Sequence, residues 1–388
     1  MLHKVSLPIQ LLIVLGFVIG FGSLLPLYMI EFFYSISLTF KECLGFLLPF
    51  IVFSFVGAGV LSFKKNAPAV IGILVSCVLL SNATISLFSY FVSTSILSSL
   101  TNKVVIEHLT NDISVIPLWI FTLPRIIKSE HAMLCAVGIG LLLTFINAPS
   151  IEQSILRFKQ SIEWIVNNLF IPILPIYVLG FLLEIYHKGV FLQLFQSYGK
   201  TFTLIFGMHI VVIFLIYFLA SQFHLQKAIQ YIKNSIPSYL TAFGTMSSTA
   251  AIPVTIKCAD KNTGNRPLAN IATPILANVH LLGDSISTPV LALTTLFLFT
   301  GNIPSLTAFC TFIVYFCLTM LAVSGVPGGG IIVMIPILKS IFGFNDAMVS
   351  IITTLYLLQD AFGTAANVMG DGALMIIINK ILKKCGIK

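Results

Sequence analysis

The sequence predicts an all-α polytopic membrane protein with eight transmembrane helices and two re-entrant helical hairpins. Of its 388 residues, 57% are hydrophobic and only 9% are charged, a composition typical of chains that lie in lipid. Apolar stretches recur along the chain, and about 20 such residues cross a hydrocarbon core of about 30 Å. Two further apolar segments are interrupted by small residues and proline, which indicates non-helical backbone at membrane depth.

Charge and cysteine content exclude other classes of protein. The net charge of +8 comes from Lys and Arg that fall between apolar stretches, so cytoplasmic loops explain it better than a nucleic-acid partner. The seven Cys are scattered without a C-x-x-C motif or another metal-ligand spacing, so we expect neither disulfides nor a zinc site. No charged run, low-complexity tract or linker sets off a soluble domain.

Eight apolar stretches are predicted as membrane spans. The first follows His3 and Lys4 and resembles a signal-peptide core, but apolar sequence continues at once without a convincing cleavage site, so we expect it to stay. The fourth is a broken span because it contains Pro117, Pro124 and several charged residues. The eight stretches are 8–29, 43–63, 67–93, 114–148, 164–187, 201–221, 267–300 and a last span that contains 355–376.

Two interrupted segments, 227–258 and 304–343, are predicted to be re-entrant. The first contains T-M-S-S-T-A-A-I-P and the second S-G-V-P-G-G-G. Each is followed by a span with a buried acid, Asp284 after the first and Asp360 after the second, 31 and 33 residues beyond the motif's proline. Paired broken helices of this kind indicate an inverted repeat and a transporter's binding site near the middle of the membrane. Ordinary Gly or Pro kinks are the alternative.

The last span carries a polar stripe. Asp360, Thr364, Asn367 and Asp371 stand at i, i+4, i+7 and i+11, so a continuous helix places them on one face. A carboxylate at membrane depth costs roughly 2.5–3.5 kcal/mol on insertion scales, and two on one face indicate a polar interior that needs them. The alternative is a helix that is buried in a bundle with satisfied polar contacts.

The basic residues predict the orientation in the plasma (inner) membrane. With each interrupted segment treated as a hairpin that returns to its own side, fourteen of the 21 Lys and Arg fall on the side of both termini and five on the other. Positive loops face the cytoplasm, so both termini are expected there.

Three motifs carry a resemblance to a known family. A-F-G-T-M-S-S-T begins at Ala242, G-V-P-G-G-G at Gly325, and D-A-F-G-T-A-A-N-V-M-G-D at Asp360. The last is close to D-x-x-R-T-x-x-N-V-x-G-D of the dicarboxylate/amino acid:cation symporter family, the glutamate transporter homologues. The order of spans and hairpins is similar to that family over nearly the whole chain. The resemblance implies a homotrimer that transports by an elevator movement.

The resemblance also implies two domains. Residues 1–63 and 114–190 are expected to form the scaffold that makes the trimer contacts. Residues 67–93 and 201–388 are expected to form the transport domain, with both hairpins.

A substrate site and a sodium site follow from the matched motifs. Asp360 is expected to hold the substrate's α-amino group with help from Thr364, and Asn367 its α-carboxylate. The tip of the first hairpin is expected to cradle that carboxylate and the tip of the second to close as the outer gate; the residues concerned are Ser247, Ser248, Val326 and Gly330. Na⁺ is expected at Asp371 and the Asn367 backbone, with Asn278 and His280 as further candidate ligands.

The departures from the family pattern concern the substrate side chain and the ions. Gly363 stands where the family has the arginine that grips an acidic side chain, which disfavours an acidic amino acid. The family N-M-D-G-T reads H-L-L-G-D here, from His280 to Asp284. The Asn and Asp of one sodium site are thereby lost, and Asp284 joins the residues expected near the substrate. We therefore expect fewer sodium ions per cycle.

Two histidines and a pair of small polar residues also lie within the predicted spans. His280 and Asp284 are four residues apart, and on one helix they form either a structural pair or a proton-coupling pair that replaces a lost cation. Ser81 and Asn82 fall near the family's T-S cation ligands, which is a weak match because small polar residues are common in helices. His209 is interpreted as a packed core histidine, because nothing polar is spaced to join it.

The sequence thus predicts a secondary active symporter, not an enzyme, for a small neutral amino acid coupled to Na⁺, with H⁺ as a second candidate coupling ion. An acidic amino acid or a C4-dicarboxylate is the alternative substrate. An intramembrane aspartyl protease and a passive channel are alternatives from other classes. The protease leaves the twin broken segments unexplained, and a channel needs no alternating gates of this type. Membrane lipid and the small-molecule substrate are the expected partners.

Overall fold

Helices are the only regular elements in the described part of the chain. The computed structural model describes residues 7–62, 68–100, 115–124, 126–127, 129–146, 148–189, 191–320, 323 and 328–386. In chain order the elements are α1 (Leu7–Phe21), η2 (Gly22–Leu24), α2 (Leu27–Ser62), α3 (Pro68–Leu100), α5 (Ser129–Phe145), α6 (Pro149–Ile165), η4 (Val166–Phe170), α7 (Ile171–His187), α8 (Phe191–Ala220), α9 (Leu225–Thr245), α10 (Ser248–Thr263), α11 (Arg266–Val279), α12 (Asp284–Thr300), α13 (Leu306–Met320), α14 (Gly329–Phe342) and α15 (Asp346–Lys384).

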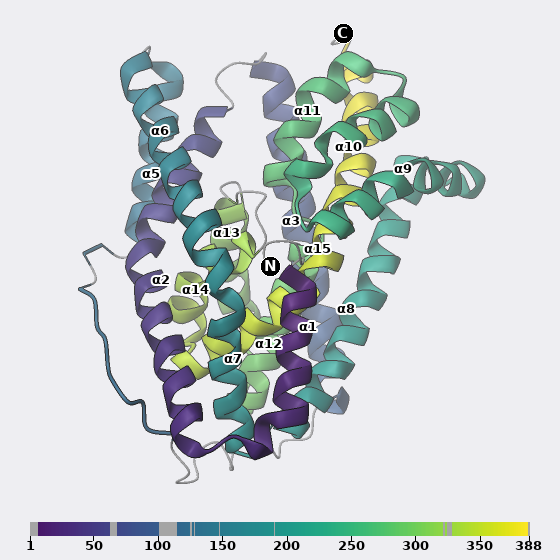
Figure 1. Ribbon diagram of the computed structural model, residues 1–388. Helices are drawn as coiled ribbons and strands as arrows, with labels where there is room; N and C mark the ends of the chain where they lie inside the picture. Colours follow the sequence, from purple (N-terminus) through teal and green to yellow (C-terminus); the bar gives the residue numbers. More distant parts are fainter. Residues whose placement is uncertain are drawn as a thin grey trace.

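The helices pack in two groups. In the first, α2 lies against α5, α6 and α7, and α1 lies against α7. In the second, α15 is surrounded by α8, α9, α10, α11 and α12, while α3 packs on α12 and α13. Figure 1 shows the first group on the left and in front, and α8 to α11 with the C-terminal half of α15 on the right. A smaller set of contacts, among them α1 with α15 and α2 with α14, joins the groups.

The first group is held by a close backbone approach between α2 and α7. A Cβ added to Gly180 would lie 2.2 Å from the Phe33 carbonyl oxygen, so only glycine fits at this crossing. The Ser37 hydroxyl donates a hydrogen bond to the Tyr177 carbonyl oxygen at 2.8 Å across the same contact. Small residues that let backbones approach are typical of helix packing in membranes.

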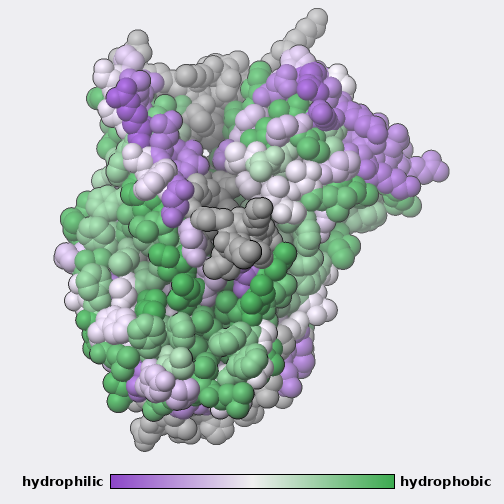
Figure 2. Space-filling view, viewed as in Figure 1, coloured by the Kyte–Doolittle hydropathy of each residue, from purple (hydrophilic) through white to green (hydrophobic). Residues whose placement is uncertain are grey.

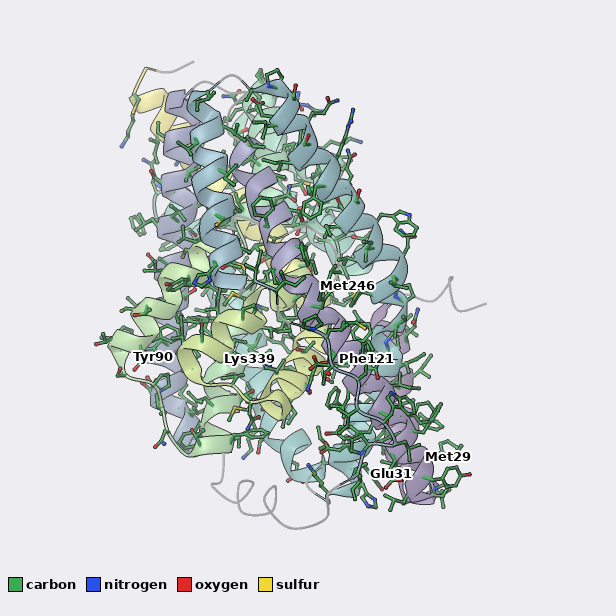
Figure 3. All side chains as sticks on the ribbon, turned by 90° about the vertical axis from the view of Figure 1, so that its left-hand side faces the viewer. Met29, Glu31, Tyr90, Phe121, Met246 and Lys339 are labelled. Carbon is green, nitrogen blue, oxygen red and sulfur yellow. The ribbon has the colours of Figure 1, made fainter. Side chains whose placement is uncertain are left out.

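The first interrupted segment forms a helical hairpin. Helix α9 ends at Met246, whose left-handed conformation (φ 50°) reverses the chain. Ser247 then caps α10 by accepting a hydrogen bond from the Ala250 amide at 3.2 Å, and α9 and α10 pack against each other. In Figure 3, Met246 lies about halfway between the two ends of the molecule, so the chain turns back in its interior.

The second interrupted segment also contains two helices that pack on each other, α13 and α14. Residues 321–322 and 324–327 between them are outside the described residues. Gly328 precedes α14 with φ +72°, a conformation that favours glycine. In the sequence, one pair of packed helices therefore precedes α11 and α12, and a second pair follows them.

The predicted span 267–300 is confirmed as a stretch long and apolar enough to cross a membrane, Arg266–Thr300, but it is interrupted between the end of α11 at Val279 and the start of α12 at Asp284. Two other predicted spans differ from the structure in their helical extent. In the stretch 114–148 the described residues are non-helical before α5, which has only 17 residues, because Pro117 and Pro124 remove backbone donors there. The first span is also shorter than predicted, since α1 ends at Phe21 and α2 begins at Leu27.

Five helical stretches among the described residues are long and apolar enough to cross a membrane. The count rises to six if the bent pair Pro149–Phe170 and Pro172–His187, with 52° between its halves, is one span. Figure 2 shows apolar side chains over most of the lower molecule and hydrophilic ones gathered at the top, over α6 and α9 to α11. The chain is therefore an all-helical, multi-pass membrane protein.

Candidate functional site

A small polar cavity lies where three interruptions of helical structure meet one face of α15. Its volume is about 20 Å³, close to that of a single water molecule. It is lined by the tip of the α9–α10 hairpin, the α11–α12 break, the start of α14 and one face of α15; the lining residues are Met246, Ser248, Ala277, Leu281, Asp284, Val323, Gly330, Tyr356, Asp360, Thr364 and Asn367.

A larger cavity of about 250 Å³ lies between α1, α7, α8 and α15. Its walls are almost entirely apolar, with residues such as Leu12, Leu182, Phe191 and Leu358. It offers no charged side chain to a ligand among the described residues. The smaller cavity has convergent polar groups and is therefore the better candidate for a specific site.

The predicted polar stripe on α15 is confirmed as a buried face of one continuous helix. Asp360, Thr364, Asn367 and Asp371 are all at most 6% exposed. Asp360 is held from two sides: its Oδ2 accepts a hydrogen bond from the Gly328 amide at 2.8 Å, and its Oδ1 accepts one from the Thr364 hydroxyl at 3.2 Å. The start of α14 and the middle of α15 thus meet at this carboxylate.

The break between α11 and α12 is held by Asn367. Its Oδ1 accepts hydrogen bonds from the backbone amides of Gly283 at 2.7 Å and Asp284 at 3.3 Å. Its Nδ2 donates to the Asp284 carboxylate at 2.9 Å. The Tyr356 hydroxyl donates to the other oxygen of Asp284. One amide side chain therefore satisfies backbone donors that the interrupted helix leaves free and also orients a buried acid.

Glycine allows the break to lie directly on α15. A Cβ added to Gly283 would lie 2.2 Å from the Gly363 carbonyl oxygen, and one added to Gly370 would lie 2.7 Å from Leu282 Cβ. Gly363 itself has room, because the nearest atom to an added Cβ is the end of Gln359 at 3.5 Å. Gly363 is not among the residues that line the cavity.

The expected pairing of His280 with Asp284 is wrong. It assumed one continuous helix, whereas the chain is interrupted between the two residues. His280 Nδ1 instead lies 3.1 Å from Asp371 Oδ1, and its Nε2 lies 2.9 Å from the Ser81 hydroxyl. Asp284 is bonded to Tyr356 and Asn367. The tertiary fold, not the spacing along one helix, selects the partners.

Oxygen atoms without a partner lie next to His280. Asp371 Oδ2 and Asn82 Oδ1 are buried and have no hydrogen-bond partner among the described residues, and Asn82 Nδ2 donates to the Val279 carbonyl oxygen at 3.1 Å. Unpartnered carboxylate and amide oxygens fit a hard alkali cation. The weak sequence match at Ser81 and Asn82 is thus brought beside the predicted ion ligand Asp371. No cluster of three or more His, Cys, Asp or Glu occurs among the described residues.

The remaining predicted site residues have the following positions. Ser248 lines the cavity, and Ser247 caps α10 beside it. Gly330 lines the cavity from α14, but Val326 is outside the described residues. Asn278 is half-buried, and its amide donates to the Pro274 carbonyl oxygen of its own helix at 2.8 Å.

Three buried polar residues were missed or misjudged. Tyr356 precedes Asp360 by one helical turn, so extending the polar stripe by four residues finds it. The interpretation of His209 as a packed core histidine is confirmed by its burial, but the expectation that it has no polar neighbour is wrong, because its Nε2 lies 3.2 Å from the Ser287 hydroxyl. That hydroxyl donates to Gln359 Oε1 at 3.0 Å, while Gln359 Nε2 is buried and has no hydrogen-bond partner in the described part of the chain. These contacts cross three helices, so sequence spacing carried no signal for them.

A multi-pass helical protein in which the tip of one helical hairpin, the start of α14 and a broken helix line a cavity with buried carboxylates belongs to the class of membrane transporters. The family model for the Sodium:dicarboxylate symporter family matches residues 6–381. The chain belongs to this family. It is a family of symporters, not of enzymes, so the protease alternative is not supported.

Curated relatives match part of the chain. Excitatory amino acid transporter 1 of Rattus norvegicus is 27% identical over 231 residues, which cover 57% of this chain and 40% of that protein. Excitatory amino acid transporter 3 of Bos taurus is 29% identical over 181 residues, 45% of this chain and 33% of that protein. The chain therefore aligns with well under half the length of the curated relatives it matches.

Proposed function

We propose that the protein is a secondary active symporter that moves a small neutral amino acid together with Na⁺. The observation that supports this most is the buried carboxylate of Asp360 in a polar cavity whose described lining has no Lys or Arg. A carboxylate in such a site is matched by a substrate ammonium group.

The alternative substrates are an acidic amino acid and a C4-dicarboxylate. The name of the family and the names of the relatives, excitatory amino acid transporters, favour them. The cavity disfavours them, because Asp284 and Asp360 both line it and no Lys or Arg is among its described lining residues. We give the local chemistry more weight, because an extra anion beside two carboxylates without a cation is strongly unfavourable.

The substrate's two ends are assigned from the cavity walls. Asp360, with Thr364, holds the α-amino group. The α-carboxylate faces the N-terminal ends of α10 and α14, at Ser248 and Gly330, where free backbone amides attract an anion. Asn367 has one N–H bonded to Asp284, and its second N–H is available to the substrate.

Uptake into proteoliposomes is the experiment that tests the proposed function. Radiolabelled amino acids are offered with a sodium gradient and a pH gradient imposed separately. Accumulation of a neutral amino acid that requires the sodium gradient, and that a sodium ionophore abolishes, is the expected result. A response to the pH gradient alone identifies H⁺ as a coupling ion. Uptake that is indifferent to both gradients contradicts the symporter.

The finer architecture is part of the same proposal. Eight spans, with α9–α10 and α13–α14 as re-entrant hairpins, account for the turn at Met246 inside the molecule. The first helix group corresponds to a scaffold of 1–63 and 114–190, and the second to a transport domain of 67–93 and 201–388. A homotrimer with elevator movement and cytoplasmic termini, in the plasma membrane, completes the proposal.

Na⁺ is proposed to bind at Asp371. Asp371→Asn is expected to raise the sodium concentration for half-maximal substrate binding at least about tenfold, because a full charge is removed from the ligand set. A tenfold change in affinity corresponds to about 1.4 kcal/mol. The measurement is sodium titration of amino acid binding by purified protein. Asp260→Asn is the matched control, since Asp260 is partly exposed and pairs with Arg266 at 3.3 Å. An unchanged sodium requirement in Asp371→Asn contradicts the assignment.

A further inference from the structure

The cavity has a second carboxylate whose role the proposed binding mode leaves open. Asp284 begins α12 at the break and is only 3% exposed. Its two oxygens accept hydrogen bonds from the Tyr356 hydroxyl and from Asn367 Nδ2. An ionised carboxylate has about four acceptor positions, so about two remain for a ligand. Because Asp284 lines the same cavity as Asp360, those positions are accessible to whatever occupies it.

The contacts of Asp284 show that it is oriented toward the cavity rather than neutralised by a basic residue. Both partners in the described part of the chain are neutral donors, and no Lys, Arg or His is among the residues that line the cavity. The backbone amide of Asp284 is held by Asn367 Oδ1, so the position of this carboxylate is set by α15. A rigid, buried acceptor of this kind discriminates between ligands.

Each class of substrate side chain meets this acceptor differently. An acidic side chain adds a third negative charge to the cavity and is repelled. A purely apolar side chain displaces water from Asp284 without replacing its hydrogen bonds, which leaves acceptor positions desolvated. A side chain with an N–H or O–H donor satisfies them. Bonds to an ionised acceptor are stronger than those between neutral groups, so the preference is large.

We propose that Asp284 selects amino acids whose side chain carries a hydrogen-bond donor, a hydroxyl, carboxamide or ammonium group. This rests on the proposed function, since it takes Asp360 as the partner of the α-amino group. Space restricts the class further. The cavity volume is only about 20 Å³, and a Cβ added to Gly330 would lie 2.4 Å from the Tyr356 hydroxyl and 3.4 Å from Asp284 Oδ1. Short side chains therefore reach Asp284 with the least displacement of the α14 wall.

Matched pairs of amino acids test the inference. Purified protein in saturating Na⁺ is titrated with serine against alanine, asparagine against aspartate, and 2,4-diaminobutyrate against 2-aminobutyrate. Each pair has nearly the same size, and the first member has the donor. We expect the donor to bind at least about tenfold more tightly in every pair, with the greatest ratio for asparagine over aspartate because charge repulsion is added.

A substitution assigns the preference to this residue. Asp284→Thr is expected to reduce the serine-to-alanine and asparagine-to-aspartate ratios at least about tenfold, since the charge is removed but a hydroxyl stays. If Asp284→Thr does not elute as a single species from size exclusion, Asp284→Asn is used as the test variant instead. Asp260→Asn is the control and is expected to keep the wild-type ratios. The wild-type ratios can be read whether or not either variant folds.

The outcomes separate this inference from the proposed function. Binding of neutral amino acids with equal affinity for serine and alanine, or with aspartate as tight as asparagine, overturns the role of Asp284 and leaves the symporter intact. Wild-type ratios that persist in a folded Asp284 variant also overturn it. If none of the amino acids binds, the proposed function fails and the inference fails with it.

Discussion

Asp360→Asn is expected to abolish amino acid binding and uptake while the protein still folds. The buried carboxylate is the proposed partner of the substrate ammonium, and removing one member of a buried ion pair costs about 3–5 kcal/mol. With about 1.4 kcal/mol for each factor of ten, the affinity falls at least about a hundredfold. Equilibrium binding of the amino acid preferred by the wild-type protein measures the loss.

The asparagine variant preserves the local hydrogen bonds. Its carbonyl oxygen still accepts from the Gly328 amide, which bonds Asp360 Oδ2 at 2.8 Å, and its amide group donates to the Thr364 hydroxyl. An unchanged melting temperature and size-exclusion profile therefore accompany the loss of binding. Asp260→Asn, a carboxylate outside the cavity, is expected to bind substrate as the wild type does. Normal binding by Asp360→Asn contradicts the proposed binding mode.

Gly283→Ala is expected to prevent correct packing of the α11–α12 break on α15. The new Cβ lies 2.2 Å from the Gly363 carbonyl oxygen, and both groups belong to backbone held by neighbouring helices. The cost exceeds the roughly 1–3 kcal/mol of ordinary overpacking, because no flexible side chain can move away. The shift also pulls the Gly283 amide from Asn367 Oδ1, a contact of 2.7 Å. We expect a lower yield of single-species protein, a reduced melting temperature and lost binding.

Two glycines provide controls for that clash. Gly363→Ala changes the other side of the same contact, but its Cβ meets only the end of Gln359 at 3.5 Å, so the protein is expected to fold. Gly207→Ala lies in α8 with no atom within 4 Å of the added Cβ, and alanine favours a helix by about 0.5–1 kcal/mol. If Gly283→Ala is as stable as these two variants, the close approach of the two backbones is not a packing constraint.

The residue pattern predicted more about the helix with the polar stripe than about any other element. A run of apolar residues with polar ones at i, i+4, i+7 and i+11 has one helical solution that buries the polar face, and α15 has this form. The two interrupted segments were also found in advance, because glycine and proline within apolar sequence have few structural uses. The motif that carries the family resemblance is also local, because it is a contiguous run of residues on α15.

The ends and breaks of the other helices were harder to predict. Nothing in L-L-G-D distinguishes a continuous helix from a break, since none of these residues is proline. Asn367 stabilises the break by accepting hydrogen bonds from the backbone amides of Gly283 and Asp284, which lie 84 and 83 residues before it in the sequence. It also requires Gly363 and Gly370 on α15 to leave space. A helix interrupted by distant partners has no signal in its own residues.

The sequence by itself therefore determined the membrane class, the family, the two interrupted segments and the identity of the acids on α15, because each depends on composition or on short-range periodicity. Only the tertiary structure decided how the acids are partnered. His280 pairs with Asp371 rather than with Asp284, and Asp284 faces the cavity of Asp360. The physical reason is that a buried polar group takes its hydrogen bonds from whichever helix packs against it, and packing joins residues that are far apart along the chain.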